Sequence, residues 1–505
     1  MIVDVPWSEA EADDLVGPGE LAELIGGTAK ALGMLRKRNP DFPEPRATAG
    51  RTPLFRLGDF VHWYEDTYAR GGPVAARGDW RRRRALEACR LDQGLDETRR
   101  FVVGTIALCH RSPSTAADLA ADGGDVAAAL PDGIATLADH DGRLAGVVDR
   151  LIGEVDVTSE PATRLARRLA RAVVGGKDPA RLADGALRHL TAMATPAGTT
   201  TSEWALVDLL LAVADPTGTS IVFDPAAGEG ALLLAAGEST GWTARLRGQE
   251  RDEWAWRIAL ARASLHDGAD LVDLGPGPAD SLTDDQWPTL RADLCVCDTP
   301  FHGKGIDRWL LHSLAHLGPD GRAVVCLPVK TLDPGRREWR VLPTGSVEAV
   351  VLCPPGLRAD TAEPIAIWSV TRRTNTHVLI VDASGLDLPT QDPHDSAGEQ
   401  RGIDALRDTL RHWRSTGEIP TQPPPGLHLA AVSTPDLADR DGDLRPATWT
   451  RQPTQAADDE TVERALTLAR DLHDLIEGPL RGTTTEEHRR GLRRLIKRLG
   501  HGSDG

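Results

Sequence analysis

The spacing of hydrophobic residues changes along the chain and divides it into regions. After an acidic start over residues 1–15, which predicts a flexible tail, residues 16–72 begin with two short helical patterns joined by a glycine turn. Residues 73–194 are rich in Ala, Leu and Arg at helical spacing and have few strand-like runs. Over residues 195–385, helical patterns alternate with short β-branched runs. This order predicts a small mixed module, an all-helical region and an α/β domain.

The β-branched runs of the third region predict a mostly parallel sheet covered by helices on both faces. In order along the chain, the runs are SIVFDP, LRGQE, ADLCVCD, RAVVCLP, VEAVVLCP and IAIWSVT. Beyond them the chain becomes rich in Pro, Asp and Thr, which predicts a linker and extended segment over residues 386–455. A helical tail with a basic end is expected over residues 456–505.

Length and charge limit the class of protein. A chain of 505 residues exceeds what one hydrophobic core usually organises, so several domains are expected. The net charge of -17 argues against a surface that attracts nucleic acid everywhere, so any contact with DNA must be local. The acidic N-terminus lacks the pattern of a signal peptide, and no apolar stretch is long enough to span a membrane. We therefore expect a soluble cytoplasmic protein.

The six cysteines are scattered, and none has the paired CxxC spacing of a zinc ribbon. Cys295 and Cys297 lie two residues apart on a predicted strand, which places both thiols on one face. Burial in the core explains them better than metal binding does. No metal site is expected.

Candidate ligand-binding residues lie where the predicted strands end. Gly228 and Gly230 form the turn between the first strand and its helix, where a ligand can approach the backbone and the helix N-terminus. Alone, such a turn could equally serve tight packing. Glu250 follows the second strand and Asp280 ends the third unit. Because the carboxyl ends of parallel strands share one edge of a sheet, these residues predict one pocket.

A four-residue motif, Asp298-Thr299-Pro300-Phe301, ends the strand ADLCVCD. It is similar to the Asn/Asp-Pro-Pro-aromatic motif of methyltransferases that act on amines, with Thr in place of the first Pro. A conjugated NH2 group is a poor nucleophile and needs two hydrogen-bond acceptors and an aromatic face. The Asp298 side chain and the Thr299 carbonyl supply acceptors, and Phe301 can stack on an adenine flipped out of the duplex. The same acceptors would suit other planar amines.

With the order of the surrounding motifs, residues 195–385 resemble the modification subunits of type I restriction-modification systems and related N6-adenine DNA methylases. The resemblance implies a Rossmann-like class I methyltransferase domain that uses S-adenosyl-L-methionine to methylate adenine N6 in double-stranded DNA. It also implies a specificity subunit or a homodimer as partner. The implied cofactor-binding residues are Thr201, Ser202, Asp224, Ala226, Gly228, Gly230, Glu250 and Asp280.

Residues 16–68 resemble small winged helix-turn-helix modules of the MerR and excisionase kind. Two helical patterns meet at a glycine turn, and DFPEP followed by GRTPLFRLGDFVHWYEDTY is similar to the wing and third helix. The resemblance implies that the second helix enters the major groove while the wing contacts phosphates. The implied DNA contacts are Lys30, Arg36, Arg38 and Arg51. A small helical docking module with a solvated charged face is the alternative.

Three functions are compatible with these residues. The first is an enzyme that methylates adenine N6 in DNA within a restriction-modification or phage-defence system. The second is a DNA-binding regulator or scaffold whose methyltransferase motif has lost its activity. The third is a methyltransferase for a different amine, such as a protein glutamine amide or a small metabolite.

Overall fold

The computed structural model describes residues 15–24, 29–49, 52–68, 77–121, 123–194, 203–301, 305–358, 364–386 and 396–450. Contacts divide the chain into Met1–Pro446 and Ala447–Gly505, and the fold that follows is that of the first unit. Arg51, Thr201 and Ser202 lie outside the described residues. So do the acidic tail before Leu15 and the expected helical tail over residues 456–505.

A small module of helices and a three-stranded antiparallel sheet opens the described chain. Its elements are β1 (Leu15–Val16), α2 (Pro18–Leu24), α3 (Ala29–Arg38), β2 (Ala47–Ala49), β3 (Thr52–Arg56) and α4 (Leu57–Tyr68), with strand order β1-β3-β2. Phe42 holds the module together, because its ring packs 5.6 Å from Phe55 and 5.7 Å from Phe60. The helices and the hairpin lie where the sequence pattern places them.

Helices alone fill residues 77–194 of the described chain. They are α5 (Arg77–Gln93), α6 (Leu95–Arg111), α7 (Pro113–Ala120), α8 (Val126–Ala138), α9 (Gly142–Gly153), α10 (Glu160–Val174) and α11 (Pro179–Ala194). Side chains cap several of them: Asp125 accepts from Ala127 N at the start of α8, and Asp141 accepts from Leu144 N at the start of α9. Their buried core extends to Ile258 of the next domain.

The α/β domain is built on one twisted sheet. Its strands are β4 (Ile221–Asp224), β5 (Arg245–Gly248), β6 (Val272–Asp273), β7 (Ala292–Asp298), β8 (Leu317–Pro328), β9 (Val347–Leu352), β10 (Ile365–Thr371), β11 (His377–Asp382) and β12 (His428–Ser433). In the described part of the chain, their order is β12-β11-β9-β10-β8-β7-β4-β5-β6. Strands β6, β5, β4, β7 and β8 are parallel, whereas β10 runs antiparallel between β8 and β9.

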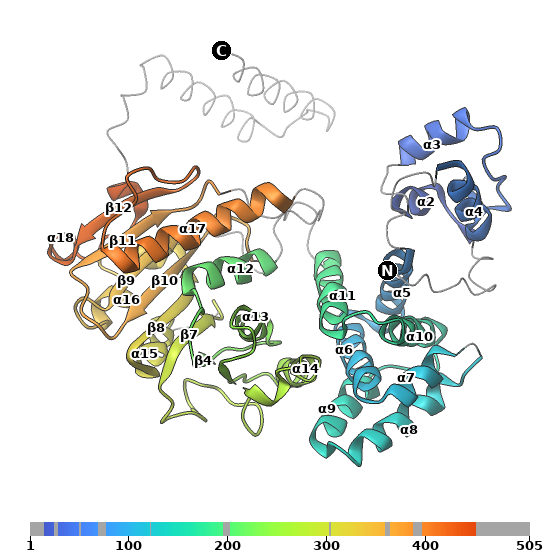
Figure 1. Ribbon diagram of the computed structural model, residues 1–505, viewed down its shortest axis with the longest axis horizontal. Coiled ribbons are helices and arrows are strands. Elements are labelled where there is room, and N and C mark those ends of the chain that lie inside the picture. Colours follow the sequence, from blue (N-terminus) through green and yellow to red (C-terminus); the bar gives the residue numbers. More distant parts are fainter. Residues whose placement is uncertain are drawn as a thin grey trace, which may run out of the picture. The chain divides into compact units, whose positions relative to one another are not determined.

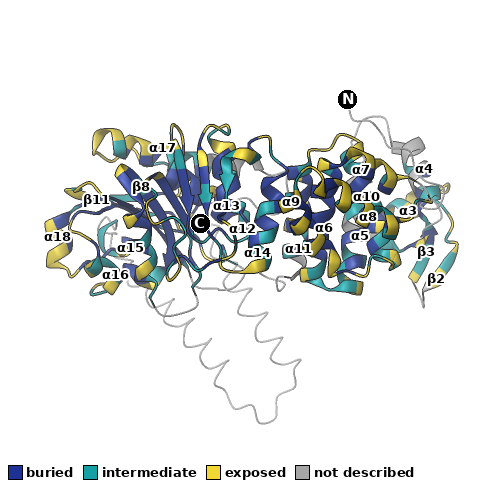
Figure 2. Ribbon diagram, turned by 90° about the horizontal axis from the view of Figure 1, so that it is seen from below, coloured by how far each residue is buried: buried dark blue, intermediate teal, exposed yellow. Residues whose placement is uncertain are grey.

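Helices cover both faces of this sheet, as the alternating pattern predicts. They are α12 (Glu203–Ala214), α13 (Ala231–Ser239), α14 (Glu253–Ala263), α15 (Asp307–Ala315), α16 (Arg337–Val341) and α17 (Ser396–Thr416), with short 3-10 turns at Ala269–Leu271 and Val329–Leu332. Strand β4 separates the two faces: Val222 belongs to the core shared with α12, α13 and α17, whereas the Phe223 ring lies 4.9 Å from that of His316, just after α15. Figure 1 shows the helices around the strands of the sheet. Figure 2 shows the strands as buried.

The expected linker over residues 386–455 is wrong in part. Helix α17 and strand β12 lie within it and complete the domain, followed by α18 (Thr434–Asp439) and α19 (Pro446–Trp449). Helix α17 buries Ile403, Leu406 and Leu410 at helical spacing in the domain core. The flanking stretches rich in Pro, Asp and Thr mask this periodicity in the sequence.

Candidate functional site

The predicted site residues gather at the carboxyl edge of the sheet, beside the point where the strand order reverses. Strand β4 has β5 and β6 on one side and β7 and β8 on the other. The chain therefore leaves β4 toward one side of the sheet and leaves β7 toward the other. Asp224 ends β4, Asp298 ends β7, and Glu250 follows β5. Open α/β sheets bind their ligands at such a switch point.

The glycine loop after β4 is held open by backbone conformations that suit glycine. Gly228 has φ 53° and Gly230 has φ 82°, both in the left-handed region. Gly228 N donates to Glu250 Oε2 at 2.8 Å, which fixes the loop against the end of β5. A Cβ atom at Gly228 would meet nothing within 4 Å, whereas one at Gly230 would lie 3.2 Å from the Ala259 side chain. Gly228 therefore borders open space, and Gly230 allows α13 and α14 to pack closely.

Asp224 is a buried carboxyl group, and among the described residues no cationic side chain pairs with it. Burial raises the pKa of Asp224 to about 8, and the nearby carboxylates of Asp298 and Glu250 add to the rise. Its side chain accepts one hydrogen bond, from Ala226 N at 3.0 Å. A buried carboxyl group beside a loop that borders open space favours a cationic ligand, and S-adenosyl-L-methionine carries both a sulfonium and an ammonium group. The residues present therefore fit S-adenosyl-L-methionine.

Asp280 lies beside this loop, although not at a strand end. Strand β6 ends at Asp273, and the chain then continues to Asp280 through a loop that Ala279 N ties to Glu250 O at 2.8 Å. Asp280 Oδ1 accepts from Leu282 N at 2.9 Å, which holds the carboxylate in a turn. The structure thus brings together all the predicted cofactor residues that it describes.

The four-residue motif forms the second half of the site. Thr299 is fully buried, and its hydroxyl donates to Cys326 O on β8 at 2.7 Å. This hydrogen bond turns the Thr299 side chain toward the sheet and leaves its own carbonyl facing the loop after β9. Phe301 packs on the edge of the core, and Asp298 is partly exposed. Thr299 is therefore fixed by a side-chain hydrogen bond where a proline ring would fix the backbone.

Sequence analysis missed one residue of this site, Arg358. It follows β9, about sixty positions from the motif, and no local pattern distinguishes it. Its Nη1 atom donates to Asp298 Oδ1 and, at 3.3 Å, to the Thr299 carbonyl. Its guanidinium carbon lies 4.2 Å from the centre of the Phe301 ring. Only the strand order β9-β10-β8-β7 brings Arg358 to the end of β7.

The helical region contacts the glycine loop directly. Arg99 of α6 forms an ion pair with Glu229, the residue between the two glycines, at 2.6 Å. Arg262 of α14 donates to the Glu229 carbonyl at 2.6 Å and pairs with Asp184 of α11 at 2.8 Å. Side chains from α6 and α14 therefore both hold Glu229, and the pair of Arg262 with Asp184 ties α14 to α11 of the helical region.

A further group of side chains could hold a metal ion by donor type. The donor atoms of Asp285, His312 and His316 lie within 4.8 Å of one another. His316 Nε2 lies 3.1 Å from Asp285 Oδ2, and Nδ1 of the same ring lies 2.9 Å from His312 O. Burial, with His316 nearby, lowers the pKa of His312 to about 4. An Asp285–His316 pair that anchors the loop before β7 accounts for the same contacts.

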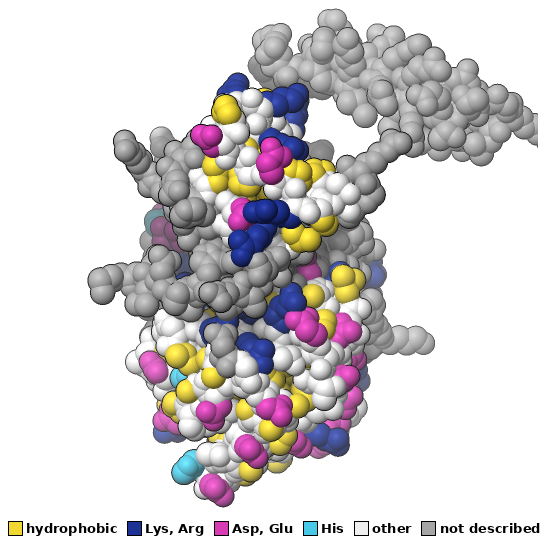
Figure 3. Space-filling model, turned by 90° about the vertical axis from the view of Figure 1, so that its right-hand side faces the viewer, with side chains coloured by type: hydrophobic (Ala, Val, Ile, Leu, Met, Phe, Trp, Pro, Cys, Tyr) yellow, Lys and Arg dark blue, Asp and Glu magenta, His cyan; other side chains and the backbone are white. Residues whose placement is uncertain are grey.

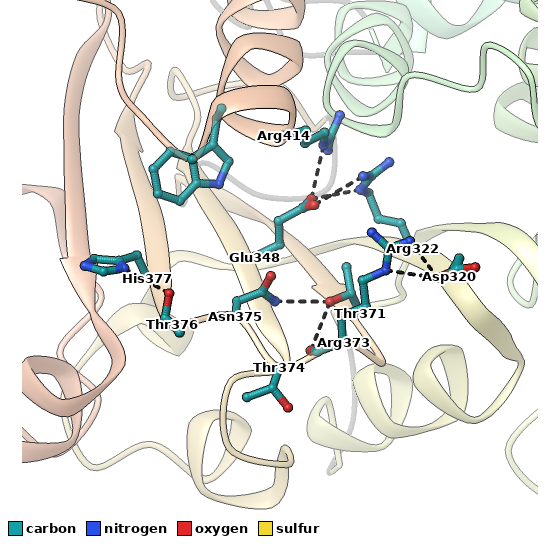
Figure 4. Close-up of a pocket in the computed structure, with 12 residues that line it drawn as sticks. Asp320, Arg322, Glu348, Thr371, Arg373, Thr374, Asn375, Thr376, His377 and Arg414 are labelled. Carbon is teal, nitrogen blue, oxygen red and sulfur yellow. Dashed lines mark hydrogen bonds and ion pairs between the residues drawn. The ribbon is translucent and has the colours of Figure 1, made fainter.

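A pocket of about 290 Å³ lies at the opposite edge of the sheet. Figure 4 shows its charged side chains paired with one another. Glu348 accepts from Arg322 Nε at 2.8 Å and from Arg414 Nε at 3.2 Å. Burial alone would raise the pKa of Glu348, but Arg414 and Arg322 overcome it and lower this pKa to about 2. The paired charges indicate a structural role.

Strand order, glycine loop and acidic strand ends define a class, the Rossmann-like α/β methyltransferase fold. The solved methyltransferase subunit of a type I restriction-modification system from Streptococcus thermophilus has this fold, with a TM-score of 0.52 and 16% identity over 88% of this chain and 93% of that one. The profile of the family described as N-6 DNA Methylase matches residues 193–308 and 304–452, together just over half of the chain. The protein belongs to this N-6 DNA methylase family.

Two curated relatives are type I restriction enzyme methylase subunits. The HindI subunit of Haemophilus influenzae is 24% identical over 247 residues, which are 42% of this chain and 55% of the relative. The MjaIX subunit of Methanocaldococcus jannaschii is 23% identical over 223 residues, 36% of this chain and 39% of the relative. The chain thus spans about half the length of these relatives or less. Within the described residues, none of the helices combines the length and hydrophobicity needed to cross a bilayer.

Proposed function

We propose that this protein transfers a methyl group from S-adenosyl-L-methionine to the N6 amine of adenine in DNA, within a restriction-modification or defence system. One observation carries the proposal. A single nitrogen position, that of Arg358 Nη1, lies within hydrogen-bond reach of both the Asp298 carboxylate and the Thr299 carbonyl. These are the two acceptors that an NH2 group requires, and the Phe301 ring lies beside them.

Each residue of the site has a defined part in this reaction. The cofactor supplies a methyl group on a sulfonium, which is the electrophile. Gly228 and Glu250 form the loop that would hold it, and Asp224 lies beside that loop. Asp298 and Thr299 accept the two amine hydrogens, which orients the nitrogen lone pair toward the methyl group. Asp298 would stabilise the positive charge that develops on the amine, whose nitrogen then releases a proton to solvent, while the sulfonium would become a neutral thioether on losing its methyl group.

Methylation of DNA by an Asp298 variant tests the proposal. The full chain is incubated with unmethylated genomic DNA and labelled S-adenosyl-L-methionine, and the nucleosides are then identified by mass spectrometry. We expect N6-methyladenine from the wild type and a loss of about a hundredfold or more in Asp298→Ala, because the amine is no longer oriented. Asp320→Ala, an exposed carboxylate at the opposite edge, is the control. Undiminished transfer by Asp298→Ala overturns the assignment, as does methylation of another base.

We infer that the N-terminal module is a winged helix-turn-helix that contacts DNA. Lys30, Arg36 and Arg38 are exposed on α3, and Arg36 also lies over the Phe55 ring at 5.4 Å. Figure 3 shows Lys and Arg side chains interspersed with acidic and hydrophobic ones on the face that it draws, so any contact with DNA must be local. Replacing Lys30 and Arg38 together with Ala should weaken DNA binding similarly for all sequences and lower its salt dependence. Unchanged binding would favour a docking module.

The contacts of Arg358 also favour a second function, a methyltransferase-fold scaffold that binds DNA without modifying it. A cation between Asp298 and Phe301 would then be a permanent part of the site. Calorimetry with S-adenosyl-L-methionine separates the two functions, since a scaffold has no need of the cofactor. A protein that binds the cofactor and modifies an amine outside DNA would instead leave genomic adenine unmethylated.

A further inference from the structure

We propose that Arg358 is an internal stand-in for the target base, which closes the base site until a nucleotide displaces it. This inference rests on the proposed function and concerns the regulation of the same site. Arg358 contacts three of the four motif residues, and each contact is one that the target adenine would make.

A guanidinium resembles an aminopurine in the properties that the site reads. Both are planar, and both carry NH2 groups conjugated into the plane. Arg358 Nη1 donates to Asp298 and to the Thr299 carbonyl, as an adenine N6 amine would. The guanidinium carbon lies over the Phe301 ring at 4.2 Å, on a face where a base would stack. Arginine and adenine therefore cannot occupy the acceptors together.

Burial makes this contact a real barrier to the base. The Arg358 side chain is 14% exposed, against 38% for Asp298. A charge-assisted hydrogen bond to a carboxylate is stronger than one between neutral groups. To reach Asp298, a neutral adenine must therefore displace the Arg358 guanidinium, which binds the carboxylate more strongly than water does. This competition lowers the apparent affinity of the site for any base. While Arg358 contacts Asp298, weakly binding ligands are thus kept away from this carboxylate.

The displaced arginine needs a new anion, and a flipped nucleotide brings one. Leu357 is 1% exposed in the domain core and fixes the backbone next to Arg358. Rotation of the Arg358 side chain can therefore release it while the backbone at Leu357 stays in place. A guanidinium matches phosphate oxygens in a fork geometry. The phosphate of the incoming nucleotide can pair with the Arg358 guanidinium, while the base of that nucleotide hydrogen-bonds to Asp298 and to the Thr299 carbonyl.

Nucleotide binding to the full chain tests the proposal without relying on turnover. The protein is saturated with S-adenosylhomocysteine, which has no methyl group to transfer, and titrated with dAMP and with deoxyadenosine by calorimetry. Arg358→Met keeps an aliphatic stem and removes the guanidinium. We expect it to bind deoxyadenosine at least tenfold more tightly than the wild type does. The wild type should prefer dAMP to deoxyadenosine, and Arg358→Met should lose this preference.

Arg373→Ala is the matched control, because Arg373 pairs with Asp320 on the surface at the opposite edge and should leave both affinities unchanged. Weaker deoxyadenosine binding by Arg358→Met would make Arg358 a positioning residue and overturn the stand-in. Equal deoxyadenosine binding by wild type and variant also overturns it but leaves the proposed function intact. If neither protein binds either probe, although both bind S-adenosylhomocysteine, the adenine site itself fails, and the stand-in with it.

Discussion

The two edges of the sheet each contain a buried carboxyl group, and their surroundings shift the pKa values of the two groups in opposite directions. At the carboxyl edge, burial raises the pKa of Asp224 to about 8, and two nearby carboxylates add to the rise. At the opposite edge, Glu348 lies between Arg322 and Arg414, and its pKa falls to about 2. The buried carboxyl group at the first edge is therefore protonated near neutral pH, whereas the one at the second edge is ionised and paired within the protein.

This difference separates a site for a ligand from a structural ion pair. A buried carboxyl group without a cation costs free energy that a bound cation can return. A buried carboxylate with two arginines and the Ser369 hydroxyl has no such need. The pocket near Glu348 is lined by charges that pair with one another within the protein.

Removing the Glu348 charge should have the largest effect on stability. In Glu348→Gln, Arg322 and Arg414 lose a buried partner, so we expect the free energy of unfolding to fall by about 3–5 kcal/mol. Urea unfolding followed by circular dichroism measures this. Glu253→Gln, which removes an exposed pair with Arg257, should leave the free energy of unfolding nearly unchanged. A small loss in Glu348→Gln would contradict a structural role.

The same pair predicts an acid limit. The pKa of Glu348 is lowered from 4.5 to about 2, so its contribution to stability is complete above pH 4.5 and lost as the pH falls through about 2. Unfolding free energies measured between these values should decline less steeply in Glu348→Gln than in the wild type. Parallel curves would show that the pair does not form.

At the carboxyl edge, changes should affect the cofactor more than the fold. Glu250→Ala removes the acceptor that holds Gly228 N, so the affinity for S-adenosyl-L-methionine should fall about ten- to a hundredfold. Calorimetry gives the affinity, and Glu253→Ala, three residues further along, serves as control. A loss of stability with unchanged affinity would place Glu250 among the structural carboxylates.

Asp224 should make cofactor binding depend on pH. A bound cation favours the ionised carboxyl group, so binding releases a proton while the free group is still protonated. Affinity should therefore rise about tenfold between roughly pH 7 and pH 9 and change little in Asp224→Asn. In the free protein, the raised pKa of Asp224 acts on stability in the opposite direction: the free energy of unfolding falls as the pH rises from about 4 to 8. An affinity that ignores pH would exclude a direct effect of Asp224.

The smallest effect is expected where the helical region braces the loop. Arg99→Ala breaks the ion pair with Glu229 but leaves the Arg262 contact to the same residue. Cofactor affinity should drop about two- to fivefold, the range of a partly exposed pair. Arg164→Ala removes an exposed pair with Glu160 and should change nothing. Equal affinities for Arg99→Ala and the wild type would confine the helical region to a passive role.

Sequence patterns predicted the parts of the site that lie at strand ends. The runs SIVFDP and ADLCVCD become β4 and β7, and their last residues, Asp224 and Asp298, meet at the switch point. The insertion of β10 between β8 and β9 could not be read from hydrophobic spacing, because a buried strand has the same pattern in either direction. Arg358 reaches Asp298 only through that strand order. Helix α17 was lost among flanking Pro-, Asp- and Thr-rich stretches.

Helix α17 also sets the order in which the protein can fold during synthesis. It packs against α12, which precedes β4 by fewer than ten residues, through the pair of Arg411 with Asp215 and the bond from Arg414 to Val213 O. A nascent chain that has left the ribosome only as far as β10 therefore presents α12 with an uncovered apolar face. The helices before residue 194 can assemble early, but the methyltransferase sheet waits for its last helix and strand. Until α17 has been synthesised, the growing α/β domain exposes apolar surface that this helix later buries.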